Sequence, residues 1–238
     1  MNLLLLEPGE RLLPREDARA RHITRILGLR PGDRLRAGEI EGAMGAARIV
    51  SDTDRGIELE FEGVCLPPAL PPVELLLGHP RPIVLRRLLR DLTTIGPSRI
   101  IVAPTELGER SYYEAGLWSD VRTPMLEGAS QGGSTQLPEL VRSTSLAQAT
   151  ELLNAQPGRR FVLHPDSSVS LLHAVRSRSG DEWLSVAVGS ERGWTNAELG
   201  ELTGAGFARC TLGRRIFRTE TAAAIAAWAA CSWYDTRS

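Results

Sequence analysis

The chain has 238 residues, of which 42% are hydrophobic and 24% charged, and its formal net charge is −1. This composition is typical of a globular protein with room for one large domain or two smaller ones, and it excludes a general attraction to nucleic acid. All 28 basic residues are arginine. A lysine general base, a Schiff-base lysine and a lysine-containing P-loop are therefore excluded, and side-chain contacts to phosphate would fall mainly to arginine.

The apolar segments and the cysteines indicate a cytoplasmic protein. No run of apolar residues is long enough to cross a bilayer, and the apolar start at Leu3–Leu6 lacks the basic residues that open a signal peptide. The three cysteines and four histidines are scattered, without a Cys-x-x-Cys pair or a metal-ligand spacing. This distribution favours a reducing compartment and no metal site.

A proline-rich segment divides the chain. Four of the seven residues in 66–72 are proline, which excludes a helix or a central strand and favours an extended, stiff connector. We therefore expect an N-terminal domain over residues 1–66, a linker over 67–72 and a C-terminal domain over 73–238.

The N-terminal segment is predicted to form a small β-rich domain. A helix is expected over residues 15–27, followed by a turn at Pro31-Gly32. Strands are expected at 34–37, 46–50 and 57–61. The last of them alternates, with Ile57, Leu59 and Phe61 on one face and glutamates on the other.

The C-terminal segment alternates strands and helices, which is the pattern of an α/β domain with a mostly parallel sheet. Strands are expected at 73–77, 99–102, 160–163, 184–188 and 208–212. Helices are expected at 83–95, 113–128, 146–153, 196–205 and 219–233. Thr195 is a candidate N-cap for the helix at 196–205.

Two glycine-bearing segments are the candidate ligand-binding elements. Residues 186–195 and 212–222 each run from the end of a predicted strand to the start of a helix. The carboxyl ends of parallel strands build the ligand crevice, and glycines there let a ligand approach the backbone closely. Neither segment is a G-x-G-x-x-G motif or a P-loop, and Ser190 directly follows Gly189, so it does not form a G-x-S-x-G nucleophile elbow. Such turns also occur as ordinary connections between elements.

Both segments resemble motifs of one family, the 16S rRNA uracil-N3 methyltransferase (RsmE) family of the SPOUT class. Residues 212–222 resemble its signature L-G-x-R-I-L-R-x-E-T-A, with Phe217 in place of a leucine, and residues 189–195 resemble its loop G-P-E-G-G-[FW]-[ST]. Residues 21–33 are similar to its stretch H-x-x-x-V-L-R-x-x-x-G-D, and residues 131–139 to its E-Q-x-G-R-x-x-x-P-E. The resemblance spans nearly the whole chain, in the order of the family.

The resemblance implies a fold that periodicity alone does not predict. Residues 1–66 would form a PUA-like β-barrel that binds RNA, and residues 73–238 a SPOUT domain with a deep trefoil knot, a feature that few proteins have. The family transfers a methyl group from S-adenosyl-L-methionine to N3 of a uridine in 16S rRNA of the assembled small ribosomal subunit. Its members are homodimers, so a homodimer is expected here. In the terminal helix, Ile225 and Trp228 share a face that would serve the core or the dimer interface.

The family binds its methyl donor with three loops of the knot. Here these would be the loop after residues 163–165, the loop 189–193 and the segment 212–218. The cofactor-binding residues that the resemblance implies are Leu163, His164, Pro165, Val188, Gly189, Ser190, Glu191, Gly193, Leu212, Gly213, Arg215, Ile216, Phe217 and Thr221.

Arg218 and Glu220 are the candidate catalytic residues. Uracil N3–H is weakly acidic, and a fixed guanidinium at Arg218 would stabilise the negative charge that develops on the ring. Alternatively, Arg218 only pairs with Glu220 or caps a strand. Glu220 would anchor that arginine or stabilise the first turn of the terminal helix through the helix dipole. Glu191 would approach the sulfonium or the substrate base, or would be a solvated loop carboxylate.

Basic residues near the N-terminus are candidates for contacts with rRNA phosphates. Acidic residues are interleaved with them, so an ordinary ion-paired surface is the alternative. The candidate RNA-binding residues are Arg11, Arg21, His22 and Arg25, and Arg15 and Arg19 belong to the same stretch.

The chain departs from the family motifs at several positions. Ser190 and Arg192 change the family's Pro-Glu-Gly-Gly loop, adding a bulky cation. Ser130 and Ser134 replace a glutamate and an arginine, and Asp91 and Thr94 replace a lysine and a glutamate near the end of a helix. These changes leave two alternatives to the family activity: a related methyltransferase with another RNA substrate, and a catalytically silent RNA-binding protein.

Overall fold

The computed structural model describes residues 2–114, 116–177 and 182–235. The chain divides into two compact units. One comprises Met1–Ala69 and Leu126–Leu137, and the other comprises Leu70–Met125 and Pro138–Ser238. A short stretch from the middle of the sequence therefore belongs to the N-terminal unit.

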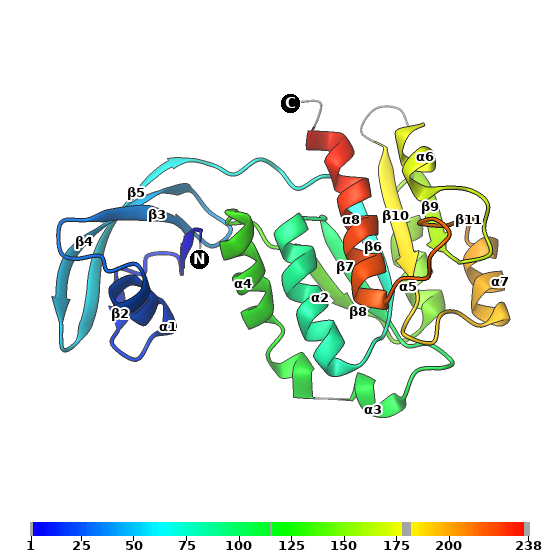
Figure 1. The fold of residues 1–238 in the computed structure, drawn as a ribbon, viewed down its shortest axis with the longest axis horizontal. Helices are drawn as coiled ribbons and strands as arrows, with labels where there is room; N and C mark the ends of the chain where they lie inside the picture. The colour runs from blue at the N-terminus through cyan, green and yellow to red at the C-terminus, as the bar shows by residue number, and fades with distance from the viewer. Residues whose placement is uncertain (1, 115, 178–181, 236–238) are drawn as a thin grey trace. The chain divides into compact units, whose positions relative to one another are not determined.

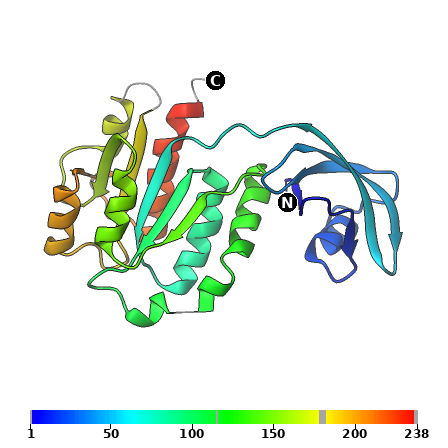
Figure 2. The same cartoon turned by 180° about the vertical axis from the view of Figure 1, so that it is seen from behind.

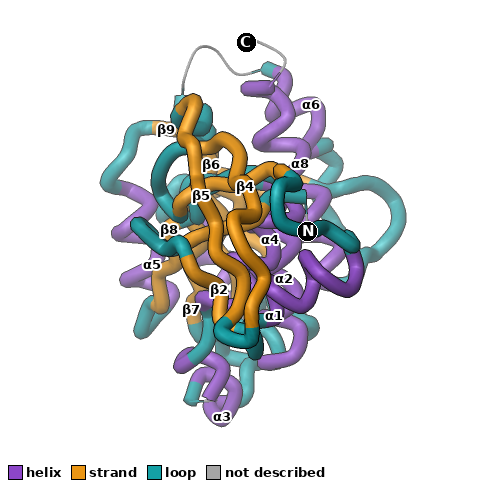
Figure 3. The backbone as a smooth tube through the Cα atoms, turned by 90° about the vertical axis from the view of Figure 1, so that its left-hand side faces the viewer, coloured by secondary structure: helices purple, strands orange, loops and turns teal. Residues whose placement is uncertain are grey.

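The N-terminal unit is built on a curled five-stranded sheet of order β1-β3-β4-β5-β2 (Figure 1). Its strands are β1 (Leu4–Leu6), β2 (Leu12–Pro14), β3 (Arg34–Glu39), β4 (Met44–Thr53) and β5 (Gly56–Cys65). Strand β1 pairs parallel with β3, and the other pairs are antiparallel. Figure 3 shows the long β4–β5 hairpin with β2 beside β5. The alternation predicted for 57–61 is confirmed, since Ile57 and Leu59 are buried and Glu58 and Glu60 are exposed.

The helix of this unit is shorter than the sequence predicts. Helix α1 (Ala18–Arg21) begins after Asp17, whose carboxylate accepts a hydrogen bond from the Arg19 N–H. It continues into a π-helical turn, η1 (His22–Ile26). Asp17 therefore sets the start three residues later than the predicted Arg15, because its side chain satisfies an N–H of the first turn. Ala20 and Ile23 join the apolar core inside the sheet.

Residues 126–137 complete the N-terminal unit. The Ser130 carbonyl accepts hydrogen bonds from the N–H groups of Asn2 and Leu3, and the Ser130 hydroxyl donates to the Leu3 carbonyl at 2.7 Å. Further along, the Thr135 hydroxyl donates to the Gly42 carbonyl at 2.7 Å. Ala129 packs with Leu3, Leu5 and Ile40 in a small apolar cluster. Both backbone bonds and side-chain burial hold this stretch on β1.

The C-terminal unit contains a six-stranded sheet of order β11-β9-β10-β6-β7-β8, and every pair in it is parallel. The predicted α/β fold with a mostly parallel sheet is confirmed. The strands are β6 (Val73–Gly78), β7 (Arg99–Ala103), β8 (Glu139–Arg142), β9 (Gly158–Leu163), β10 (Trp183–Val188) and β11 (Phe207–Cys210).

Helices cover both faces of this sheet. On one face, α2 (Pro82–Ile95) packs against α8 (Thr219–Asp235), which also contacts β6, β10 and α6 (Leu171–Arg176) (Figure 1). On the other face lie α5 (Leu146–Asn154) and α7 (Asn196–Gly204) (Figure 2). Alternate residues of a strand point to opposite faces of the sheet. Because helices cover both faces, the central strands are buried on both sides, as β6 is over its whole length.

The single helix predicted over 113–128 is wrong. The structure has α3 (Arg110–Tyr113), a 3₁₀ turn η2 (Gly116–Ser119) and a separate helix α4 (Arg122–Gly132). The Asp120 carboxylate accepts hydrogen bonds from Thr123 and Arg86, which hold the pKa of Asp120 below its ordinary value. Asp120 thus starts a new helix, and Pro124 fits its first turn, where a missing N–H costs nothing.

Four elements were not predicted from the sequence, namely β1, β2, β8 and α6. Three of them are strands of three or four residues, too short for an alternation to be recognised. The last strand also ends earlier than predicted, at Cys210, so Thr211 and Leu212 lie in the following loop.

Candidate active site

The loops after three adjacent strands meet at one edge of the C-terminal sheet. Strands β9, β10 and β11 end at Leu163, Val188 and Cys210, and β9 lies between the other two. An open cavity of about 690 Å³ lies at these ends, lined by the three loops together with α2 and the start of α8. This is the place where parallel sheets bind ligands.

Most of the residues selected from the sequence line this cavity. They are Leu163, His164, Pro165, Val188, Gly189, Ser190, Glu191, Gly193, Leu212, Arg215, Ile216 and Phe217, together with Arg218 and Glu220. Gly213 and Thr221 do not line it. Gly213 has a φ of 127° and open space beside its Cα, so its role is to make the turn.

The glycine loop 189–193 is a tight turn that leaves no room for a side chain at its start. The Gly193 N–H donates to the Ser190 carbonyl at 2.9 Å, and Gly193 has a φ of 73°. A Cβ atom at Gly189 would lie 2.9 Å from the Gly193 Cα and 3.3 Å from the Trp194 Nε1. Glycine at 189 is therefore required by close backbone approach, and glycine at 193 by its left-handed conformation.

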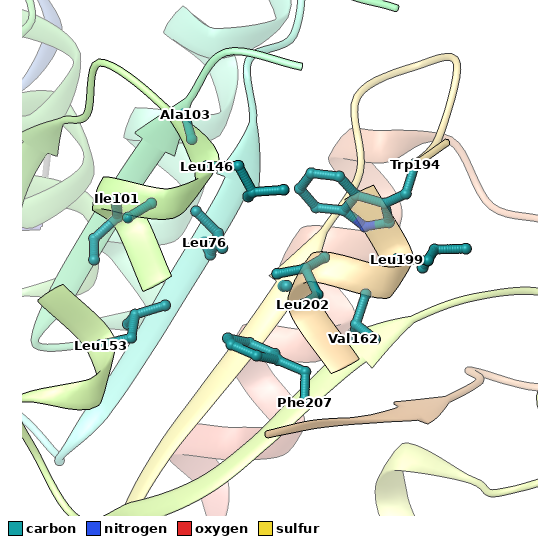
Figure 4. Close-up of a cluster of buried hydrophobic side chains, with 12 residues drawn as sticks. Leu76, Ile101, Ala103, Leu146, Leu153, Val162, Trp194, Leu199, Leu202 and Phe207 are labelled. Atoms are coloured by element: carbon teal, nitrogen blue, oxygen red, sulfur yellow. The ribbon is translucent and has the colours of Figure 1, made fainter. Parts of the chain in front are cut away.

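Trp194 anchors the end of this loop. Its side chain is 8% exposed and packs into the core with Leu76, Leu146 and Leu199 (Figure 4). Its Nε1–H is buried and makes no hydrogen bond within the described part of the chain, although Trp194 lines the cavity. A buried donor without a partner costs free energy, so the indole N–H is suited to bind a ligand atom.

A buried carboxylate joins the glycine loop to the loop after β7. Glu198 Oε2 accepts a hydrogen bond from the Thr195 N–H and Oε1 accepts one from the Glu106 N–H, both at 2.8 Å. The Thr195 hydroxyl accepts from the Glu198 N–H, which completes a capping box and confirms Thr195 as the N-cap of α7. The same hydroxyl donates to Glu106 Oε2 at 2.7 Å.

Helix α2 contributes a wall that the sequence did not predict. Arg81, Ile83, Val84 and Arg87 line the cavity. Glu191 Oε1 accepts a hydrogen bond from the Arg81 backbone N–H at 3.1 Å, so this carboxylate links the glycine loop to the start of α2. The signal was available, because Gly78 to Pro82 has the glycine and prolines of a strand end before a helix.

Arginine dominates the charge around the cavity. Five arginines and only two carboxylates, Glu191 and Glu220, line it; the arginines are Arg81, Arg87, Arg192, Arg215 and Arg218. Arg192 donates to the Leu107 carbonyl at 3.3 Å. The other four guanidinium groups make no ion pair or hydrogen bond to any residue that the structure describes. In particular, Arg218 and Glu220 are both described and form no ion pair, so the pairing alternative for Arg218 is not found.

His164 enters the cavity wall with a defined hydrogen bond. Its Nδ1 accepts from the Asp166 N–H at 3.3 Å. A neutral imidazole that accepts at Nδ1 carries its proton on Nε2, so His164 can offer an N–H donor to a ligand.

The candidate RNA-binding residues lie in the N-terminal unit. Arg11 is bonded to Glu39 at 3.0 Å and lies over the Phe61 ring. Arg15 pairs with Asp52, and Arg19 pairs with Glu10 and Asp17. In contrast, the side chains of Arg21, His22 and Arg25, at the end of α1 and in η1, make no hydrogen bond or ion pair with another described residue, although the charge of Arg21 helps to lower the pKa of Asp17.

Most departures from the family motifs lie away from the cavity. Ser130 and Ser134 belong to the stretch that completes the N-terminal unit. Asp91 is bonded to Arg90, and Thr94 donates to the Arg90 carbonyl, both on the outer side of α2. Only Ser190 and Arg192 line the cavity.

The described residues contain no group of three or more His, Cys, Asp or Glu side chains placed to hold a metal ion. None of the helices that the structure describes is both long and apolar enough to cross a membrane.

Known proteins match this chain over most of its length. A family model for the RNA methyltransferase domain matches residues 68–231. Ribosomal RNA small subunit methyltransferase E of Treponema pallidum is 38% identical over 95% of this chain and 89% of its own. This chain belongs to that methyltransferase family. It is an RNA methyltransferase, as the motifs at 189–195 and 212–222 predict.

Other members of the family support the match. Ribosomal RNA small subunit methyltransferase E 1 of Borreliella burgdorferi is 27% identical over 93% of this chain and 94% of its own. Among solved structures, the corresponding Neisseria gonorrhoeae enzyme, bound to S-adenosyl methionine, superposes with a TM-score of 0.69 at 21% identity over 99% of this chain and 97% of its own. A Legionella pneumophila protein, in complex with the same cofactor, gives 0.75 at 21% identity, over 99% of this chain and 97% of its own. These likenesses confirm the fold.

Replacing Glu198 by alanine should destabilise this methyltransferase because the partly buried N–H groups of Thr195 and Glu106 lose their acceptor. We expect the free energy of unfolding to fall by about 2 kcal/mol or more, measured by urea denaturation. Glu201→Ala is the matched control, since Glu201 is an exposed residue of the same helix, and it should change the value by less than about 0.5 kcal/mol. Equal losses in the two variants would show that the Glu198 bonds do not stabilise the loops.

Proposed function

We propose that this protein transfers a methyl group from S-adenosyl-L-methionine to N3 of a uridine in 16S rRNA of the assembled small ribosomal subunit. The observation that carries the proposal is the position of the family signature. Residues 212–222 form one wall of the cavity and the glycine loop forms another, after β11 and β10, the two strands that flank β9. The Treponema pallidum relative is named as a methyltransferase of small-subunit ribosomal RNA.

The cavity fits a methyl donor of this size and polarity. Its volume of about 690 Å³ is within the usual range for a small-molecule site. Gly189 leaves backbone accessible, the Trp194 indole N–H is a buried donor without a partner, and His164 offers a further N–H. When bound, S-adenosyl-L-methionine supplies an electrophilic methyl group on a sulfonium. The residues that would hold it are those of the 163–165, 188–193 and 212–217 segments that line the cavity.

Arg218 is the proposed catalytic residue. Methyl transfer to N3 needs the loss of a weakly acidic proton to water or a base, and the ring carries negative charge from that loss until the N3–methyl bond forms and the thioether leaves. The guanidinium of Arg218 lines the cavity and is not neutralised by a described carboxylate, so it is free to stabilise that charge. Glu220 lies in the first turn of α8, where a carboxylate stabilises the helix through its dipole. That position favours a structural role for Glu220.

The N-terminal unit is the proposed RNA-binding part. The side chains of Arg21, His22 and Arg25 form no hydrogen bond or ion pair with other described residues, whereas Arg11 is already paired. We propose that the first three contact rRNA phosphates and that Arg11 contributes less. The same proposal includes three features of the fold. The N-terminal sheet is a PUA-like domain, residues 67–72 are the linker, and the C-terminal domain is knotted. The bridge between Ser170 and Thr211, which joins the segment after β9 to the segment after β11, is consistent with a knotted chain.

We also propose a homodimer, with Trp228 at the interface. Trp228 on α8 is 59% exposed, which is unusual for so large an apolar side chain. The alanines at 223, 226, 227 and 230 are buried within their own subunit, so they are not available to a partner helix. Light scattering at micromolar concentration should give twice 25.9 kDa, and Trp228→Glu should give the monomer mass. A monomer mass for the unsubstituted protein would contradict the dimer.

The two alternatives are another RNA substrate and a silent RNA-binding protein. Four of the six departures lie outside the cavity, which favours retained activity. The deciding experiment is the nucleoside profile of 16S rRNA from a strain that lacks the gene. Loss of 3-methyluridine, restored by the gene, is expected. An unchanged profile would reject the proposed substrate.

A Gly189→Ala substitution should weaken cofactor binding. The new Cβ would lie 2.9 Å from the Gly193 Cα and 3.0 Å from the Gly193 carbonyl carbon, so the loop must move. We expect the affinity for S-adenosylhomocysteine, measured by calorimetry, to fall at least about tenfold, which is about 1.4 kcal/mol. Gly200→Ala is the control because nothing lies within 4 Å of its added Cβ, and it should bind normally. Normal binding by Gly189→Ala would contradict the assigned cavity.

Replacing Arg218 by alanine should lower turnover far more than cofactor affinity. A group that stabilises charge only in the transition state affects the rate and not ground-state binding, and losing one such donor costs about 100- to 1000-fold. Arg218→Lys should restore little, because an ammonium cannot replace the planar guanidinium. Arg214→Ala, a neighbour outside the cavity, should keep its turnover. Near-normal turnover in Arg218→Ala would end the catalytic assignment.

A further inference from the structure

The cavity has an arginine pair on α2 that belongs to none of the sequence motifs. Arg81 immediately precedes α2 and Arg87 lies in its second turn, and both line the cavity although their side chains are largely exposed. The two motifs that line the cavity, 189–195 and 212–222, begin more than 100 residues later. These two cations therefore need an explanation of their own.

The other arginines of the same helix are neutralised, and these two are not. Arg86 pairs with Asp120 at 3.2 Å, and Arg90 pairs with Asp91 at 3.3 Å. Neither guanidinium of Arg81 and Arg87 forms an ion pair or hydrogen bond with a described residue. Glu191 is close to Arg81, but its carboxylate accepts from the backbone N–H and not from the guanidinium. The helix thus keeps two positive charges on the side that lines the cavity.

The start of α2 adds a donor at the same place. The N–H groups of Val84 and Leu85 both donate to the Arg81 carbonyl, and Pro82 has no N–H. The Ile83 N–H makes no hydrogen bond within the described chain, and Ile83 lines the cavity. The N-terminal end of this 14-residue helix carries partial positive charge, which strengthens the preference of the two arginines for an anion.

The surroundings indicate which anion binds. The glycine loop and the buried Trp194 N–H suit the methyl donor. The lining of the cavity also has exposed apolar side chains: Ile83, in the first turn of α2, is 58% exposed, Ile216 84% and Phe217 37%. Exposed aromatic and aliphatic side chains beside arginine are typical of surfaces that bind single-stranded RNA, on which bases stack and phosphates pair with guanidinium groups.

We propose that Arg81 and Arg87 bind a phosphodiester of the RNA substrate next to the nucleotide that is methylated. This rests on the proposed function, because it takes the cavity as the place where donor and target base meet. The planar guanidinium groups contact the non-bridging phosphate oxygens, and the Ile83 N–H supplies a further donor. The pair holds the target strand against the cavity and takes no part in binding the methyl donor.

The test compares Arg81→Ala and Arg87→Ala with Arg86→Ala and Arg90→Ala, which remove arginines of the same helix outside the cavity. The first readout is binding of a short single-stranded uridine-containing oligoribonucleotide by fluorescence anisotropy at several salt concentrations. Each cavity arginine lost should weaken binding up to about tenfold and lower the slope of log K against log salt by about 0.7. The controls should keep the slope of the unsubstituted protein.

Two further readouts separate this role from the alternatives. Calorimetry with S-adenosylhomocysteine should give unchanged affinity in all four variants. With small ribosomal subunits that lack the modification, Arg81→Ala and Arg87→Ala should raise KM more than they lower kcat. Thermal melting of Arg81→Ala and Arg87→Ala should match the unsubstituted protein, since these two exposed side chains make no hydrogen bond or ion pair with another described residue.

Three results would overturn the proposal. Loss of S-adenosylhomocysteine binding with an unchanged salt slope would show that the anion is the carboxylate of the donor. A salt slope equal to that of the controls would show that no phosphate is bound. If the unsubstituted protein shows no salt-dependent binding of the oligonucleotide, this would also show that no phosphate is bound. The oligonucleotide assay does not depend on methylation. A reduced salt slope in Arg81→Ala and Arg87→Ala, together with unchanged 3-methyluridine in 16S rRNA of the strain that lacks the gene, would therefore reject the proposed reaction and support the phosphate site.

Discussion

The geometry of the cavity depends on one buried carboxylate. Glu198 receives N–H groups from Thr195 and Glu106, so the loops after β10 and β7 are held by the same side chain. Trp194, immediately before Thr195, is fixed in the core at the same point. With its far end secured in this way, the glycine loop can form a tight turn. Its flank therefore adds to the hydrogen bonds that Glu191, Arg192 and Gly193 make within the loop and to its neighbours.

The distribution of positive charge on the described surface depends on which arginines form ion pairs with carboxylates. Several arginines of the described surface are ion-paired, as Arg34 with Glu62 and Arg48 with Glu60, and the chain as a whole is nearly neutral. Around the cavity, four guanidinium groups have no described carboxylate beside them to offset their charge. A nearly neutral protein can therefore present a local positive field, which attracts an anionic substrate to one place and not to the whole surface.

Much of the fold and of the site could be predicted from the sequence, because strong patterns specify them. The alternation of apolar strands and helices predicted the parallel sheet, and the motifs at 189–195 and 212–222 predicted two walls of the cavity. Arg81 and Arg87 were missed because they lie just before and within α2, in a segment without such a motif, and only the adjacency of β6 and β10 brings that helix to the cavity. The break near Asp120 was missed since it depends on a side-chain bond to Thr123. Pattern alone cannot show which strands are neighbours or which caps form.

The attachment of residues 126–137 to β1 has a consequence for the order of folding. The Ser130 hydroxyl reaches the Leu3 carbonyl across 127 residues of sequence, and Leu3, Leu5 and Ile40 are covered only when Ala129 arrives. During synthesis, part of the apolar surface of the first unit therefore remains exposed after strands β1 to β5 have been made. It must wait until the chain has passed residue 137, by which time β6 and β7 have also been made. Although its five strands come first in the sequence, this unit can complete its fold only after the first strands of the other unit have been made.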